Sequence, residues 1–304
     1  MLAFLFPGQG TLRVGMGAWL RGRPEATEVF DRADRLLDTP VGPLCARGPA
    51  ERLVATENAQ PAVTVCGLAA LAVLRAEGHE PGIVAGHSVG ELAALHAAGA
   101  LSFEATLRLV ATRARLMAAV TATGSMTAVL GLNVDEVEEL VARAAAPDEP
   151  LVVGLENAAD HVVVSGATPA VDRLVALATA ARKTTPLTVS NAFHSPLMAD
   201  AVDAWAEAVR AEELRTPRIP VLPNVTAEPT TDPAVLRDAL VDQLTRRVRW
   251  ARTMTRLAGH PEVELAVEVG DSKVLTGLAR PAGLRCLPMS DPTTPRRLTR
   301  ERTG

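Results

Sequence analysis

One serine of this chain lies in a setting that could make it a nucleophile. It is Ser88 in the run GHSVG (residues 86–90), which follows a short apolar run at 83–85 and precedes a helical pattern at 91–100. A nucleophilic serine needs an exposed position on a strained strand-to-helix turn, and flanking glycines permit that turn sterically. The start of the following helix offers free N–H groups to a developing oxyanion. The run therefore predicts a nucleophilic Ser88; its alternative is a glycine-rich turn that only packs a strand on a helix.

Such a serine needs a base, most often a histidine, and the chain has six histidines. His79 and His260 lie in polar loop contexts, where we expect them to be solvated. Three others adjoin the serine, lie on a predicted helix or open a predicted strand (His87, His96 and His161). The remaining candidate is His194, in the run NAFHSP (191–196). Its spacing fits a base, and its alternative is a histidine that caps a helix.

Two further features could contact a substrate. The run PGQG (7–10) follows the first predicted strand, where open α/β sheets bind ligands, and Gln9 offers amide donors there. Arg113 lies beside the apolar stripe of the predicted helix at 103–120. An arginine near a core face is usually paired, best with a carboxylate, and the sequence offers no obvious acidic partner. A ligand carboxylate and a plain surface position both remain open for Arg113.

The elements that would position these residues follow an α/β order. Strands are expected at 2–6, 83–85, 219–225, 265–269 and 286–289. Helical patterns lie at 25–38, 60–77, 91–100, 103–120, 196–212, 233–244, 250–259 and 273–280. Strand, tight turn and helix in repetition indicate a mainly parallel sheet.

The middle of the chain has a different order. Strands at 125–132, 151–155, 161–165 and 184–189 and helices at 134–145 and 169–181 give β-α-β-β-α-β, the order of a ferredoxin-like unit. This unit is complete in itself. We therefore expect a large α/β subdomain from residues 1–124 and 195–304, with an inserted ferredoxin-like subdomain at 125–194.

Composition excludes several classes of protein. The chain has 304 residues, enough for about two domains. Its net charge of −4 argues against a general nucleic-acid binder. Three scattered cysteines suit neither a disulfide framework nor a zinc site, so we expect no metal and a reducing compartment. The apolar stretches stop short of the ~20 residues of a membrane span, and the start is no signal peptide. The expectation is a cytoplasmic protein without a membrane segment.

Six motifs in order resemble the malonyl-CoA:acyl carrier protein transacylase family. The resemblance covers residues 2–290. It rests on FPGQG (6–10), ENAQPA (57–62), GHSVGE (86–91), Arg113 with its flanking Leu-Met, AFHSP (192–196), and EVG…KVLTGL (268–278). It implies a hydrolase-like α/β large subdomain with a ferredoxin-like small one inserted. It also implies a free-standing acyltransferase of fatty acid or polyketide synthesis.

The resemblance also implies roles for the residues that match these motifs. Ser88 matches the acylated nucleophile and His194 its base. Backbone N–H groups at the positions of Gln9 and Val89 form the family's oxyanion hole. Three further matches concern the substrate and the histidine: Arg113 holds the malonyl carboxylate, Gln60 is a pocket glutamine, and the backbone carbonyl of Gln243 orients the histidine in place of a triad acid.

The acyl group and the partners follow from the same resemblance. Phe193 beside the histidine is typical of malonyl-type rather than methylmalonyl-type enzymes. The substrates implied are a CoA thioester and an acyl carrier protein with its phosphopantetheine arm, with no bound cofactor, and we expect a monomer. Because carrier proteins are acidic, the docking surface should be basic, and the densest cluster is Arg246, Arg247, Arg249 and Arg252. A solvated arginine cluster without a partner is the alternative.

Three other functions stay open from the sequence. A same-fold acyltransferase could move a different acyl group between carrier proteins of a polyketide pathway, although a neutral chain would leave Arg113 unpaired. A serine esterase would need a triad acid between Ser88 and His194, where Asp160 and Asp172 fall inside the inserted unit. A carrier-binding relic without activity would not need the intact Ser88 and His194 pair. Neither the pathway nor the cognate carrier protein follows from the sequence.

Overall fold

Two separate sheets organise the chain. The computed structural model describes residues 1–304 except 11, 292, 295–296 and 299–304. The first sheet is parallel throughout, with the order β7-β2-β1-β8-β9. Its strands are β1 (Leu2–Phe6), β2 (Ile83–Gly86), β7 (Val221–Leu222), β8 (Leu265–Glu268) and β9 (Cys286–Pro288). They are short, nearly continuous apolar runs, because helices cover both faces of a parallel sheet.

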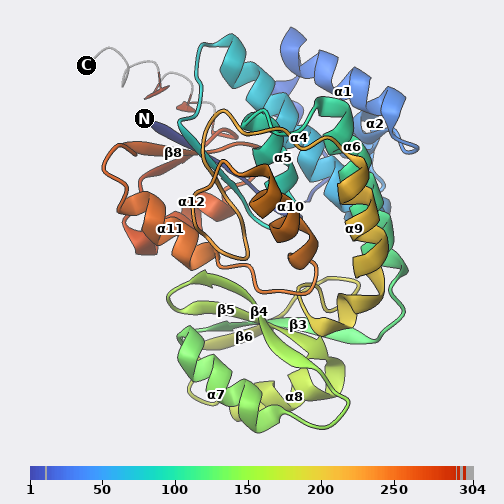
Figure 1. The fold of residues 1–304 in the computed structure, drawn as a ribbon, viewed down its shortest axis with the longest axis vertical. Helices are drawn as coiled ribbons and strands as arrows, with labels where there is room; N and C mark the ends of the chain where they lie inside the picture. The colour runs from blue at the N-terminus through green and yellow to red at the C-terminus, as the bar shows by residue number, and fades with distance from the viewer. Residues whose placement is uncertain (11, 292, 295–296, 299–304) are drawn as a thin grey trace.

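The helices of this part of the chain pack around the parallel sheet (Figure 1). They are α1 (Pro24–Leu36), α2 (Val41–Arg47), α3 (Ala50–Val54), α4 (Thr56–Ala76), α5 (Gly90–Ala97), α6 (Phe103–Ala119), α9 (Val202–Ala211), α10 (Pro233–Asp242), α11 (Trp250–Ala258) and α12 (Val274–Ala279). Three short 3-10 helices accompany them: η1 (Ala18–Leu20), η2 (Pro196–Ala201) and η3 (Arg280–Ala282).

Helix α4 is longer than the sequence pattern predicts. It begins at Thr56 rather than near 60, so its 21 residues suffice by length and composition to cross a membrane. However, 83% of its most apolar window is buried inside the structure. A helix that is apolar on all sides is expected at the centre of a core, and α4 packs against α1, α5 and α6.

The second sheet is antiparallel and lies at one end of the molecule, with α7 and α8 over one of its faces (Figure 1). Its elements follow the order β3 (Gly124–Leu130), α7 (Val134–Ala144), β4 (Leu151–Ala158), β5 (His161–Ala167), α8 (Thr168–Leu177) and β6 (Lys183–Pro186). The strand order β4-β5-β3-β6 and a small core of its own make this a ferredoxin-like unit. The predicted fold class is confirmed; the predicted boundary residues of the two subdomains stay a prediction.

Four further elements differ from the sequence prediction. Strand β7 has two residues rather than seven, because Pro220 and Pro223 flank it and proline cannot donate to a ladder. Helices α2 and α3 are not predicted by the pattern, since prolines and glycines interrupt residues 40–49. The predicted helix at 196–212 divides into η2 and α9.

Backbone hydrogen bonds join the antiparallel sheet to the segment between α10 and α11. Glu156 of β4 donates its N–H to the carbonyl of Val248 at 2.9 Å, and Val248 donates to the carbonyl of Gly154 at 2.9 Å. Nearby, Arg247 forms an ion pair with Glu138 of α7. These bonds hold together the two parts of the chain that line the cavity over Ser88.

Candidate active site

Ser88 occupies the tight turn between β2 and α5. Its φ of 52° is in the left-handed region, which is strained for a residue with a side chain. The flanking glycines are sterically required, because a Cβ at Gly86 would lie 2.1 Å from the Gly90 backbone. A Cβ at Gly90 would lie 2.2 Å from the carbonyl oxygen of Phe6 in β1. The turn thus holds Ser88 at the carboxyl end of the sheet, as the sequence predicts.

His194 faces the Ser88 hydroxyl. Its Nε2 lies 2.8 Å from Ser88 Oγ, and its Nδ1 lies 2.8 Å from the backbone carbonyl of Gln243. A carbonyl can only accept, so Nδ1 carries the proton and Nε2 is left to accept from the serine hydroxyl. Burial, and next the charge of Arg113, lower the pKa of His194 to about 3, which keeps the imidazole neutral at pH 7.

This geometry decides between alternatives that the sequence leaves open. The cap of η2 is the side chain of Ser195, which accepts from Leu197 N at 3.3 Å, so the capping interpretation of His194 is wrong. The partner of Nδ1 is a backbone carbonyl rather than Asp160 or Asp172, so a triad acid of the esterase type is not formed.

Arg113 is buried, with 1% of its surface exposed, so the surface interpretation is wrong. Its Nη1 donates to Gln60 Oε1 at 2.7 Å and its Nη2 to Gln243 Oε1 at 2.8 Å. Nη2 also lies 3.3 Å from Ser88 Oγ. Burial lowers the pKa of Arg113 to about 10, so it stays charged at pH 7. The structure thus holds the charged guanidinium of Arg113 next to the hydroxyl of Ser88.

A cavity of about 320 Å³ opens over Ser88. It is lined by Gln9, His87, Ser88, Arg113, Phe193 and His194, and by apolar side chains from the antiparallel sheet, α6 and α12. Val89 is buried at the start of α5. Within the described part of the chain, no residue accepts a hydrogen bond from the backbone N–H of Gln9 or Val89.

The sequence reasoning misses two residues of this site, Glu91 and Asn224. Glu91 follows the turn and is fully buried, and Asn224 follows β7 and is 2% exposed. Asn224 Oδ1 accepts from the N–H of Ser88 at 2.7 Å. A signal exists for Glu91, since it is the single acid of the apolar helix α5. His79, which the sequence places in solvent, is also buried, at 2% exposure.

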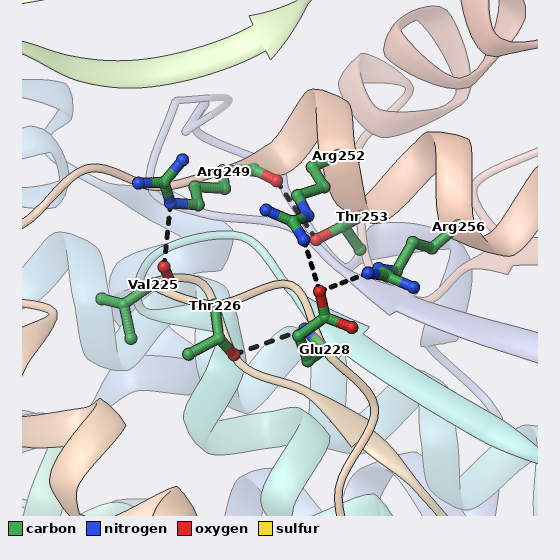
Figure 2. A network of polar contacts seen from close by, with 7 residues as sticks. All are labelled: Val225, Thr226, Glu228, Arg249, Arg252, Thr253 and Arg256. Atoms are coloured by element: carbon green, nitrogen blue, oxygen red, sulfur yellow. Dashed lines mark hydrogen bonds and ion pairs between the residues drawn. The ribbon is translucent and has the colours of Figure 1, made fainter.

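The four arginines predicted to dock a carrier protein are engaged in ion pairs and hydrogen bonds. Arg246 pairs with Asp242, and Arg247 with Glu138 and Glu156. Figure 2 shows that Arg252 and Arg256 donate to the same carboxylate oxygen of Glu228, while Arg249 donates to the backbone carbonyl of Val225. Arg247, Arg249 and Arg252 line a groove that shares Leu278 with the Ser88 cavity. The docking role of this cluster stays a prediction.

The described residues contain no group of three or more histidine, cysteine or acidic side chains that could hold a metal ion. The three cysteines are free thiols, of which Cys45 and Cys66 are buried.

Comparison with known proteins identifies the family. The model of the acyl transferase domain matches residues 3–283. The malonyl CoA-acyl carrier protein transacylase of Bacillus subtilis (strain 168) is 35% identical over 300 residues, covering 96% of this chain and 94% of the relative. The structure of the transacylase of that name (fabD) from Coxiella burnetii has a TM-score of 0.94 at 33% identity, covering 99% of this chain and 97% of that chain.

A second similar structure contains a carrier protein bound to its transacylase. It is a malonyl-transacylase in complex with its type II PKS acyl-carrier protein, PlMCAT:AntF, with a TM-score of 0.94 at 30% identity and 99% of both chains covered. The family model covers far more than half of the chain, and the Bacillus subtilis relative matches it nearly end to end. The chain therefore belongs to the acyl transferase domain family.

Proposed function

We propose that this protein transfers a malonyl group from malonyl-CoA to the phosphopantetheine thiol of an acyl carrier protein through an acyl-Ser88 intermediate. The relatives carry the name of this activity. One observation supports it most strongly: Ser88 Oγ lies 2.8 Å from His194 Nε2 and 3.3 Å from Arg113 Nη2 in one cavity. His194, which can take the hydroxyl proton, and Arg113, which can bind a carboxylate, thus both lie next to Ser88 Oγ.

In the first half-reaction, His194 Nε2 takes the hydroxyl proton as Ser88 Oγ attacks the thioester carbon. The N–H groups of Gln9 and Val89 are the donors available for the oxyanion that forms. Collapse of this tetrahedral intermediate breaks the carbon–sulfur bond, and His194 returns the proton to the leaving CoA thiolate. In the second half-reaction the carrier thiol gives its proton to His194 and attacks the carbonyl carbon of the acyl-serine ester. The bond from this carbon to Ser88 Oγ then breaks, His194 returns the proton to Ser88 Oγ, and the malonyl thioester of the carrier leaves.

Arg113 explains why a malonyl group is favoured over a neutral acyl group. Gln60 and Gln243 hold its guanidinium from two sides, so it is preorganised to receive a carboxylate as a bidentate partner. The alternative of a different acyl group moved between carrier proteins gains no support from a buried cation that a neutral chain would leave unpaired.

The proposed setting of the reaction follows the relatives. The partner is an acyl carrier protein, as in the PlMCAT:AntF complex, and CoA enters as a substrate rather than a resident cofactor. A cytoplasmic, monomeric enzyme accords with the proposed reaction.

The experiment is intact-protein mass spectrometry after incubation with malonyl-CoA. Ser88→Ala should abolish both the adduct and transfer to a carrier protein, because the hydroxyl is the acyl acceptor. Ser272→Ala is the matched control, since Ser272 lines the same cavity and should leave the adduct intact. An adduct of unchanged yield in Ser88→Ala would refute the proposed function.

A further inference from the structure

A buried carboxylate lies behind the reacting residues, and the mechanism above does not use it. Glu91, in the first turn of α5, has none of its surface exposed. Its Oε2 accepts from the backbone N–H of Asn224 at 3.0 Å, from Asn224 Nδ2 at 2.5 Å and from Gln243 Nε2 at 2.7 Å. Its Oε1 is buried and has no hydrogen-bond partner among the described residues. Burying a carboxylate with one oxygen unpartnered costs free energy, so we expect a role for Glu91 that offsets this cost.

The carboxylate fixes the orientation of two side-chain amides. An ionised carboxylate only accepts, so both amides must turn their NH₂ groups toward Glu91 and their oxygens away from it. The oxygen of Asn224 then accepts from the backbone N–H of Ser88 at 2.7 Å. The oxygen of Gln243 accepts from Arg113 Nη2 at 2.8 Å. If either amide were reversed, its NH₂ group would face another donor, which is the N–H of Ser88 for Asn224 and Nη2 of Arg113 for Gln243.

Both ends of the serine's backbone are held by these amides. Gln243 Nε2 donates to the carbonyl of Ser88 at 3.2 Å, in addition to its bond with Glu91. Asn224 Nδ2 also donates to the carbonyl of Gly86, at 2.6 Å. These bonds surround a residue whose φ of 52° is strained and persists only where its surroundings over-determine it.

We propose that Glu91 is a positioning residue that, through the amides of Asn224 and Gln243, holds both the strained backbone of Ser88 and the guanidinium of Arg113 in their reacting geometry. The inference rests on the proposed malonyl transfer and adds a residue that touches neither substrate nor the reacting atoms. The amide of Asn224 holds the nucleophile Ser88, and the amide of Gln243 holds Arg113, the cation that receives the malonyl carboxylate. These two contacts are called the two arms below.

The charges around Glu91 give the proposal a pH signature. Burial raises the pKa of Glu91 to about 7, against the opposing effects of its bonds to Asn224 and Gln243 and of the Arg113 charge. Arg113 on α6 keeps its charge, and burial lowers the pKa of the three histidines of the cavity, His87, His161 and His194. Glu91 is therefore a group of this site whose charge changes near neutral pH, and its protonation weakens the acceptor that orients both amides.

The test compares Glu91→Gln with Glu268→Gln. Glu268 is a second fully buried carboxylate, and it accepts from Leu275 N, Thr276 N and Thr276 Oγ1 at the start of α12. The rate of acyl-Ser88 formation from malonyl-CoA and from acetyl-CoA is followed by rapid-quench mass spectrometry between about pH 5 and pH 9. Circular dichroism establishes that each variant is folded.

The wild-type kcat/KM for malonyl-CoA should fall as the pH falls through about 7. Glu91→Gln should be at least about tenfold slower at high pH, because its NH₂ forces one amide to turn, and it should lack this acidic limb. Glu268→Gln should keep the limb and its rates within about threefold of the wild type. A limb that persists in Glu91→Gln, or a rate within threefold of the wild type, would overturn the proposal.

Two variants test the arms separately if Glu91→Gln does not fold. Gln243→Leu keeps the backbone carbonyl for His194 and should reduce malonyl transfer more than acetyl transfer. Asn224→Ala should slow both acyl groups to the same extent, because it frees only the serine. Wild-type rates in both variants would overturn the proposal. The outcome is separable from the proposed function, since an adduct that survives in Ser88→Ala refutes acyl transfer through Ser88 whatever these variants do.

Discussion

At the scale of the residue, Arg113 carries the choice of acyl group. Replacing it with alanine should lower kcat/KM for malonyl-CoA by at least about tenfold, since a buried charge-assisted pair is worth about 2–5 kcal/mol. Transfer of an acetyl group, which has no distal carboxylate, should be retained or increased. Steady-state rates with both CoA thioesters measure the ratio.

The control for this change lies on the same helix. Arg115 is exposed, two residues further along α6, so Arg115→Ala removes an arginine without touching the cavity. A malonyl rate in Arg113→Ala that stays within a factor of three of the Arg115→Ala rate would remove Arg113 from the acyl-binding site.

The predictability of individual residues depended on how local their signal is. Ser88 lies between two glycines that the turn requires sterically, so five consecutive letters suffice to predict its place in the turn. Arg113 lies at the border of an apolar stripe, and periodicity alone leaves its burial open. Its partners Gln60 and Gln243 are 53 and 130 positions away, and Asn224 is 136 positions from Ser88. Contacts over such distances have no periodic pattern in a single sequence.

At the scale of the element, the start of α11 and the segment before it carry the predicted docking surface. The side chains of Arg246 and Arg252 are 67% and 48% exposed, whereas Arg247 is 21% exposed and bonded to the antiparallel sheet. Arg247 is therefore a poor probe of docking, because its loss would also loosen the contact between this segment and the antiparallel sheet.

The sharper variant is Arg246→Glu/Arg252→Glu. It should raise the KM for the carrier protein, most at low salt, because exposed charges steer encounters over a Debye length of ~8 Å at physiological ionic strength. Acylation by malonyl-CoA should change little. Arg215→Glu is the control, since Arg215 is 63% exposed and also paired with a neighbouring acid, Glu213. Equal losses in both half-reactions would indicate a folding defect, and no loss in either would place docking elsewhere.

Elements with a strong periodic pattern are the ones that the sequence predicts well. The β-α-β-β-α-β order of the antiparallel sheet is an example, because its strands alternate with amphipathic helices such as α7. Strand β7 is predicted too long, since apolar letters around two prolines mimic a strand that lacks ladder donors. Helices α2 and α3 lie among prolines and glycines and depend on their packing against α4.

At the scale of the whole molecule, two buried groups of the site give the stability opposite dependences on pH. His194 has a folded pKa of about 3, below its ordinary 6.5, so its contribution is present above pH 6.5 and is lost as the pH falls. Glu91 has a folded pKa of about 7, above its ordinary 4.5, so its contribution is present below pH 4.5 and is lost as the pH rises toward 7. The two effects oppose each other between pH 4.5 and 6.5.

Removing one group should expose the other. On acidification from pH 7 to pH 5, His194→Gln should gain stability relative to the wild type, and Glu91→Gln should lose it, each by about 1–2 kcal/mol. Denaturant unfolding at the two pH values measures both differences. Parallel changes in the two variants would contradict the assigned shifts.

Two different parts of the chain line the cavity, and this affects how its acyl substrate can change in evolution. Ser88, Arg113 and Gln9 come from the part of the chain around the parallel sheet, whereas Met126, Leu155 and Val163 of the antiparallel sheet supply apolar lining. None of these three is a reacting group. Mutation can therefore resize the chamber for a longer or branched acyl chain while the reacting groups keep their places. The size of the acyl chain that the chamber admits and the bond-making apparatus are therefore separately evolvable traits of one chain.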